Sequence, residues 1–163
     1  MKGLVYKSTG SWYSVKTEGG NIYDCKIKGK LRLKNINSTN PVVVGDIVEF
    51  IVEEHDLQKI GIIQKIHDRR NYILRKSVNL SKQTHILASN IDLLLLVVTA
   101  KNPITTTSFI DRFLVSAEAY SIKTILVFNK CDIYDEDDHI LLNSMINIYD
   151  NIGYETLNTS TLS

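Results

Sequence analysis

Apolar and β-branched residues alternate with polar ones in short runs through the first 70 residues of the chain. Five such runs, separated by turn-forming residues, cover residues 4–6, 12–15, 21–28, 46–52 and 59–66. Runs of this length, with a period of two and turn signals between them, predict strands. Five short strands with little helix predict a small closed barrel. An OB-like barrel is the favoured form, and an SH3-like barrel fits the same strand count.

The pattern changes after residue 90. Residues 91–99 are almost continuously apolar, which predicts a strand buried on both faces of a parallel sheet. Helical periodicity follows at 108–120, a second buried strand at 124–128, a second helix at about 138–152 and a short strand at 154–159. The apolar stripes predicted for the two helices are Ile110, Phe113, Leu114 and Ala117 in the first and Leu141, Met145, Ile148, Tyr149 and Ile152 in the second.

The second helix carries signals at both ends. Asp137 or Asp138 can cap its start, and Gly153 can end it in a left-handed conformation. Alternating strands and helices predict a parallel α/β unit whose ligands bind at the carboxyl ends of the strands. The expected fold class is α/β plus all-β, with an OB-like barrel at 1–72, a linker at 73–82 and a partial α/β domain at 83–163.

Composition places the chain among globular proteins. Hydrophobic residues make up 44% and charged residues 23% of its 163 residues, which excludes a disordered or collagen-like chain. Cys25 and Cys131 form no C-x-x-C pair, so neither a disulfide framework nor a zinc site is indicated. No signal peptide and no bilayer-spanning apolar run are recognisable, so a cytoplasmic protein without membrane association is expected.

The net charge of +1 conceals a difference between the two halves. Residues 1–80 contain 14 Lys and Arg against 8 Asp and Glu, whereas residues 81–163 contain 5 against 10. In the basic half a cation recurs at every second position, and a strand would direct all of these side chains to one face. Such a row predicts contact with RNA phosphates, the alternative being a solvated edge strand guarded by lysine. The row consists of Lys26, Lys28, Lys30, Arg32 and Lys34.

Three aromatic residues lie in the same half of the chain. Trp12, Tyr13 and Tyr23 are candidate platforms on which RNA bases could stack, as in other OB-folds. Each of them also suits a place in the barrel core. Nothing in this half indicates recognition of a particular base.

The second buried strand is followed directly by Asn129-Lys130-Cys131-Asp132. At this place a carboxylate at Asp132 can accept hydrogen bonds from guanine N1–H and from the guanine amine, neither of which adenine offers there. The stem of Lys130 can lie along the base, and the Asn129 amide can hold the loop. The spacing N-K-x-D therefore predicts guanine recognition, the alternative being a polar turn. The candidate nucleotide-binding residues are Asn129, Lys130, Cys131 and Asp132, together with Ser160 and Thr161 at the end of the third strand.

A phosphate-binding loop of the form G-x-x-x-x-G-K-[ST] is absent from the sequence. A basic barrel followed by N-K-x-D and a serine segment, with no phosphate loop before them, resembles the circularly permuted GTPases. The chain is similar along nearly its whole length to the ribosome small-subunit-dependent GTPase A (RsgA) family. The segments that carry the resemblance are VVGDIV at 43–48, ASNID at 88–92, FIDRFL at 109–114, NKCD at 129–132 and YDNIGY at 149–154.

This resemblance implies a partial, circularly permuted P-loop-type GTPase domain after the barrel. The phosphate loop, the switch regions and a zinc-binding module would follow residue 163. The resemblance implies that the intact protein hydrolyses GTP with Mg²⁺ during late maturation of the small ribosomal subunit, and that its barrel contacts rRNA near the decoding region. We expect this chain to be a monomer that binds RNA, binds GTP or GDP weakly and hydrolyses nothing by itself.

Two other classes of function remain open on the sequence alone. The chain could be a non-enzymatic RNA-binding translation or assembly factor with a degenerate α/β scaffold. Salt-dependent RNA binding without nucleotide preference would support that function. It could instead be an interaction module for a protein partner, in which case reversing the charge of Lys28, Lys30 and Arg32 would leave RNA binding unchanged.

Overall fold

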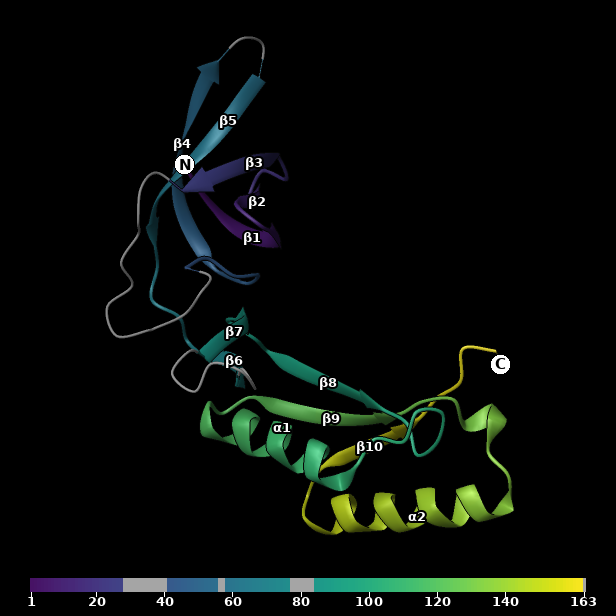
Figure 1. Cartoon of the computed structure of the whole chain (residues 1–163). Helices are drawn as coiled ribbons and strands as arrows, with labels where there is room; N and C mark the ends of the chain where they lie inside the picture. Colours follow the sequence, from purple (N-terminus) through teal and green to yellow (C-terminus); the bar gives the residue numbers. More distant parts are fainter. Residues whose placement is uncertain (28–40, 56–57, 77–83, 163) are drawn as a thin grey trace. The chain divides into compact units, whose positions relative to one another are not determined.

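The computed structural model describes residues 1–27, 41–55, 58–76 and 84–162, which fall into two compact units. The first unit comprises Met1–Ile91 and the second Asp92–Ser163. Figure 1 colours the chain along its sequence, so the strands of the first unit run from purple to teal and the second unit ends in yellow.

Five strands of the first unit form a closed barrel in the order β1-β2-β3-β5-β4. The first three strands are an antiparallel meander, β5 pairs with β3 in parallel, and β4 closes the barrel against β1. This order is that of an OB-like barrel and not of an SH3-like one, so the prediction of an OB-like barrel is confirmed. The strands are β1 (Lys2–Thr9), β2 (Trp12–Thr17), β3 (Ile22–Ile27), β4 (Ile47–His55) and β5 (Gln58–Ile66).

Alternate residues of these strands fill the barrel interior. Tyr13 and Val15 of β2 point inward and are at most 3% exposed. Trp12, the first residue of β2, is 42% exposed. Tyr13 therefore belongs to the core and offers no surface on which a base could stack. Burial raises the pKa of the Cys25 thiol to about 12, because a thiolate would lose its hydration there. The core consists of Val5, Tyr13, Val15, Cys25, Val42, Val48, Phe50 and Ile63.

Two further strands, β6 (Tyr72–Lys76) and β7 (Thr84–Ser89), pair with each other in antiparallel fashion. The linker predicted at residues 73–82 therefore begins inside a strand, and residues 77–83 lie outside the described part of the chain. The contacts of β6 and β7 place them in the first unit, which extends to Ile91. The division into an RNA-binding part and a GTPase part at residues 73–82 stays a prediction.

A buried ion pair between Asp46, just before β4, and Arg69, between β5 and β6, also binds the end of β7. The Asp46 carboxylate is fully buried and accepts hydrogen bonds from Arg69 Nε and Nη2, both at 2.7 Å, and from Ser89 Oγ at 2.6 Å. The Asn90 side chain donates to the carbonyl oxygen of Gly45 at 2.8 Å. A buried carboxylate is tolerated only when it is paired and hydrogen-bonded. This network therefore fixes residues 89–90 against the start of β4.

The second unit is a three-stranded parallel sheet with the order β10-β9-β8, covered by two helices. Two right-handed crossovers that advance in one direction along a sheet leave both helices on the same face, and Figure 1 shows α1 and α2 on one side of the sheet. Neither of these described helices is long and apolar enough to cross a membrane. The elements are β8 (Leu93–Val98), α1 (Thr107–Ala119), β9 (Lys123–Phe128), a 3₁₀ turn at Cys131–Ile133, α2 (Glu136–Asn151) and β10 (Glu155–Asn158).

The prediction that the first strand of this sheet is buried on both faces is wrong for β8. Leu96 and Val98 pack beneath the helices, but Leu93, Leu95 and Val97 are 42%, 54% and 59% exposed. The residues alternate because both helices lie on one face of the sheet. The other face of β8 is apolar and uncovered by any described residue.

The buried stripe of α2 also differs from the predicted one. Met145 and Tyr149 are buried as expected, but Leu142 is the third core residue. The other predicted members, Leu141, Ile148 and Ile152, are 47%, 51% and 64% exposed. Apolar residues cover more than half of the helix circumference, so periodicity alone did not identify the face that packs on the sheet.

The ends of α2 are set by a capping box and a glycine. Asp135, and not Asp137 or Asp138, is the N-cap: its side chain accepts from the backbone N–H of Asp138, whose side chain accepts from Asp135 in return. Gly153 adopts a φ of +95° directly after the C-cap, as predicted. The cap lies earlier than predicted because the reciprocal pair needs an acceptor at both positions of the box.

Candidate functional site

The Asn129–Asp132 loop begins where β9 ends, beside the end of β10. The backbone N–H of Asn129 donates to the Val98 carbonyl of β8 at 2.8 Å. The Asn129 side-chain oxygen accepts a hydrogen bond from Thr159 Oγ at 3.1 Å, and the N–H of Cys131 donates to the Thr159 carbonyl at 3.2 Å. The loop is therefore tied to both neighbouring strands at the edge of the sheet where parallel α/β folds bind ligands.

Asp132 and Ser160 meet across this edge. The Ser160 hydroxyl donates to one carboxylate oxygen of Asp132 at 2.5 Å, and Asp132 remains exposed. A carboxylate oriented by one hydrogen bond keeps lone pairs on both oxygens with which it can accept donors from a ligand. Thr161, the other residue predicted in this segment, is exposed just beyond Ser160.

Lys130 has an unusual backbone conformation, with a φ of +65°. A non-glycine residue in this left-handed region costs about 1 kcal/mol or more, and such strain concentrates at functional sites. The Lys130 ammonium donates to the Asn102 carbonyl at 2.6 Å, which draws its side chain across the loop toward the segment after β8. The lysine stem therefore forms one wall of the site.

Tyr134 supports this loop from beneath. Its hydroxyl donates to the Asn129 carbonyl at 2.8 Å and accepts from the backbone N–H of Ala100 at 2.9 Å. Sequence reasoning missed Tyr134, Thr159 and Asn102. The available signal was their position, since each lies within a few residues of a predicted strand end at the ligand edge.

The segment after β8 is held to the start of α2 by Lys101. Its ammonium donates to Asp138 at 2.7 Å and to Asp135 at 3.1 Å. The hydrogen bonds to Asp138 and Asp135 raise the pKa of Lys101. The backbone hydrogen bond from Asp138, followed by that from Lys101, lowers the pKa of Asp135. This ion pair keeps the Asn102 carbonyl in reach of Lys130.

The predicted RNA-binding row is only partly within the described structure. Lys26 is exposed on β3, and its ammonium lies 4.0 Å from the centroid of the Trp12 ring. Tyr23 is half-buried and packs against Phe50, with 5.4 Å between the ring centroids. Lys28, Lys30, Arg32 and Lys34 lie outside the described residues.

No cluster of metal-ligating side chains is found in the described part of the chain. Nowhere among residues 1–27, 41–55, 58–76 and 84–162 do three His, Cys, Asp or Glu side chains gather so that they could hold a metal ion. At the loop, Asn129, Lys130, Asp132 and Ser160 can act by hydrogen bonding and charge pairing.

We expect one of the two cysteines to react with a thiol reagent in the folded chain. Cys131 is half-buried in the loop, whereas Cys25 is buried in the barrel and its pKa of about 12 leaves roughly one thiol in 10⁴ ionised at pH 8. A chromogenic disulfide reagent should therefore titrate about one thiol in native buffer and two in denaturant. Loss of the fast thiol in Cys131→Ser is the control, and rapid reaction of both native thiols would contradict the structure.

Comparison with known families assigns both parts of the chain. The family model described as RsgA GTPase matches residues 66–163, and the model described as RsgA N-terminal domain matches residues 2–63. A Christiangramia forsetii protein named small ribosomal subunit biogenesis GTPase RsgA is 56% identical over 160 residues, which cover 98% of this chain and 51% of that relative. A Bacteroides fragilis protein of the same name is 55% identical over 163 residues, covering 100% of this chain and 52% of that relative.

Solved structures resemble the chain over the same span. YjeQ from Thermotoga maritima superposes with a TM-score of 0.66 at 34% identity, over 98% of this chain and 51% of that one. YloQ, described as a circularly permuted GTPase, superposes with a TM-score of 0.62 at 28% identity, over 99% and 52%. The chain spans about half the length of the curated relatives it matches. Since the GTPase model alone matches more than half of its residues, the chain belongs to the RsgA GTPase family.

Proposed function

We propose that the protein is a GTPase of small-subunit ribosome assembly and that residues 92–163 supply its guanine-recognition part. The observation that carries this proposal is the Asp132 carboxylate at the end of β9, exposed and oriented by Ser160 Oγ at 2.5 Å. The six nucleotide-binding residues of the proposal are Asn129, Lys130, Cys131, Asp132, Ser160 and Thr161.

The proposed roles follow from the chemistry of these groups. Asp132 accepts the N1–H and amine hydrogens of guanine, and the Lys130 stem covers the face of the base. Asn129 positions the loop through its hydrogen bond with Thr159. Backbone N–H groups of the Ser160–Thr161 segment meet the guanine carbonyl. A base that cannot offer two donors would leave the carboxylate unpaired, which is how such a site rejects adenine.

Residues outside 1–163 would hold the phosphates, Mg²⁺ and the structural zinc of the intact protein. Two observations support this part of the proposal. The sequence contains no phosphate loop, and Leu93, Leu95 and Val97 form an apolar sheet face of the kind that other elements cover in complete α/β domains. The guanine nucleotide affinity of this chain alone is then weak.

The barrel is proposed to contact the rRNA of the small subunit, with the protein acting as a cytoplasmic monomer. The relatives from Christiangramia forsetii and Bacteroides fragilis are named for small ribosomal subunit biogenesis. An OB-like barrel with an exposed Lys26 and an exposed Trp12 supports an RNA contact. Lys28, Lys30, Arg32 and Lys34 are proposed to extend that contact.

The test compares GTP hydrolysis by the intact natural protein and by the 163-residue chain, with and without purified small ribosomal subunits. We expect the intact protein to release phosphate in a magnesium-dependent reaction that small subunits accelerate and large subunits do not. The 163-residue chain should show no turnover above the protein-free background, because it lacks phosphate contacts. Robust turnover by that chain, or an intact protein insensitive to small subunits, would contradict the proposal.

A further inference from the structure

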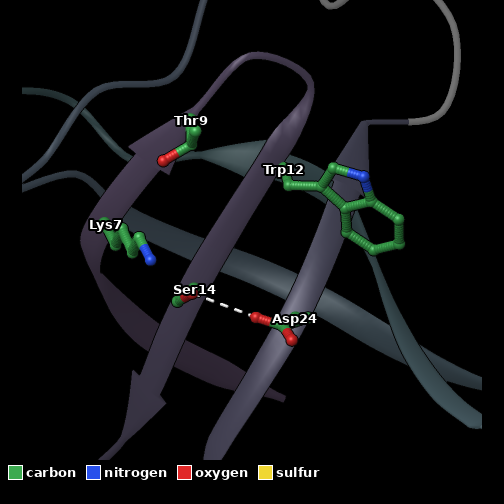
Figure 2. Close-up of a pocket in the computed structure, with 5 residues that line it drawn as sticks. All are labelled: Lys7, Thr9, Trp12, Ser14 and Asp24. Atoms are coloured by element: carbon green, nitrogen blue, oxygen red, sulfur yellow. Dashed lines mark hydrogen bonds between the residues drawn. The ribbon is translucent and has the colours of Figure 1, made fainter.

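A pocket of about 230 Å³ lies on the outer surface of the first three barrel strands. Figure 2 shows the five side chains that line it: Lys7 and Thr9 of β1, Trp12 and Ser14 of β2, and Asp24 of β3. The register places Lys7 opposite Ser14, Ser14 opposite Asp24, and Thr9 opposite Trp12. Since opposite residues of antiparallel strands share a face, these five side chains converge on one place.

Trp12 provides the apolar surface of this pocket. It is 42% exposed although the Lys26 ammonium lies against its ring. Lys26 does not line the pocket, so the indole surface beside Thr9 and Ser14 is left for a ligand. An exposed indole accompanied by a cation is the combination that stacks nucleic-acid bases while it neutralises their phosphates.

Asp24 makes the pocket unsuited to a phosphate. Ser14 Oγ donates to one carboxylate oxygen at 3.0 Å, as the dashed line in Figure 2 shows. Within the described part of the chain, no hydrogen bond or ion pair engages the other oxygen. A carboxylate repels phosphates but accepts hydrogen bonds from amines and ring N–H groups. The group that fits is therefore the donor edge of a base.

We infer that this pocket binds one unpaired RNA base that carries an exocyclic amine. The base stacks on Trp12, its amine donates to Asp24, and the flanking phosphates lie near Lys7 and Lys26. Cytosine places its N4 amine where uracil has a carbonyl oxygen that the carboxylate repels, so the pocket prefers cytosine to uracil. The inference rests on the proposed function, in which the barrel contacts RNA, and adds to it a base preference and the residues that produce it.

The test uses two labelled ten-nucleotide RNAs, oligo(C) and oligo(U), titrated with the 163-residue chain at low salt. Oligo(C) should bind about tenfold more tightly and should quench the fluorescence of Trp12, which is the single tryptophan of the chain. Trp12→Leu should lower the affinity of the chain for both RNAs about tenfold. Asp24→Asn should abolish or reverse the preference, because an amide can donate to the uracil carbonyl and accept from its N3–H.

Asp68→Asn is the matched control, since it removes the same charge from an exposed position of the same unit. Both aspartate variants should strengthen RNA binding slightly through charge, but only Asp24→Asn should change the ratio of the two affinities. Equal affinities in the unchanged chain, or a ratio that survives Asp24→Asn, would overturn the inference while leaving RNA binding by the barrel intact. If the chain binds neither RNA and the intact protein also fails to bind small-subunit rRNA, the RNA contact of the proposed function fails as well.

Discussion

Replacing Gly45 by alanine is expected to destabilise the first unit by more than about 4 kcal/mol, which approaches the total stability of a small domain. A Cβ atom there would lie 1.9 Å from the Ser89 carbonyl oxygen and 2.9 Å from its carbon. Ser89 cannot withdraw without breaking its N–H···O bond to Val44 at 2.9 Å and the 2.8 Å bond from Asn90 to Gly45. The φ of +93° adds a conformational cost for any side chain.

Gly20→Ala is the matched control for this experiment. Gly20 has a φ of +83°, but a Cβ atom would meet nothing within 4 Å, so only the conformational cost of about 1 kcal/mol applies. Urea unfolding followed through the fluorescence of Trp12 reports on the first unit in both variants. Equal unfolding midpoints for the two variants would mean that a Cβ atom at position 45 does not clash with the Ser89 carbonyl.

The strands of the barrel and its closed form could be predicted from the sequence, but the strand pairing that closes it could not. Alternation and turn residues are local signals, and they indicated all five strands to within a few residues. The parallel pairing of β3 with β5 and the ion pair between Asp46 and Arg69, 23 residues apart, depend on non-local contacts that no local pattern encodes. VVGDIV and ASNID, two of the segments that carry the family resemblance, contact each other in the structure, because Ser89 donates to Asp46 and Asn90 donates to Gly45.

In the second unit, the periodicity of apolar residues predicted the helices and strands correctly, but it did not predict which of their faces are covered. Leu93, Leu95 and Val97 are as apolar as the buried residues between them, so the sequence alone does not distinguish a covered face from a bare one. In α2 the neighbouring Leu141 and Leu142 are chemically identical, and only packing against the sheet selects Leu142. The apolar character of a residue favours its burial, but the elements that pack against a helix or strand decide which of its faces is buried.

The candidate site could be predicted only where its residues form a motif of fixed spacing or directly follow a predicted strand. Asn129 and Asp132 were identified because N-K-x-D follows a buried strand, and Ser160 because it follows the next one. Thr159 was missed, since its hydrogen bond to Asn129 forms only when β9 and β10 lie side by side. Tyr134 was missed, since its hydroxyl joins Asn129 to Ala100 and therefore depends on β8 and β9 being neighbours.

Replacing Asp132 by asparagine in the intact protein is expected to lower its affinity for GDP about 10³-fold. The carboxylate accepts two guanine hydrogens, whereas an amide presents one acceptor and one N–H group that faces the guanine amine. The loss of a charge-assisted hydrogen bond, together with two N–H donors that face each other at the bound base, costs about 4 kcal/mol of binding free energy. Xanthine has a carbonyl oxygen in place of that amine, so Asp132→Asn should bind xanthosine diphosphate better than GDP.

Competition of GDP and xanthosine diphosphate against a fluorescent guanine nucleotide measures both affinities. Asp137→Asn is the control, since Asp137 is exposed in the first turn of α2 and the substitution changes the charge equally. Ser160→Ala should lower the affinity for GDP only about tenfold, because the carboxylate remains and loses one orienting hydrogen bond. If Asp132→Asn keeps its preference for guanine, Asp132 does not contact the base. If Ser160→Ala is as damaging as Asp132→Asn, the serine contributes more to the base site than its hydrogen bond to the carboxylate.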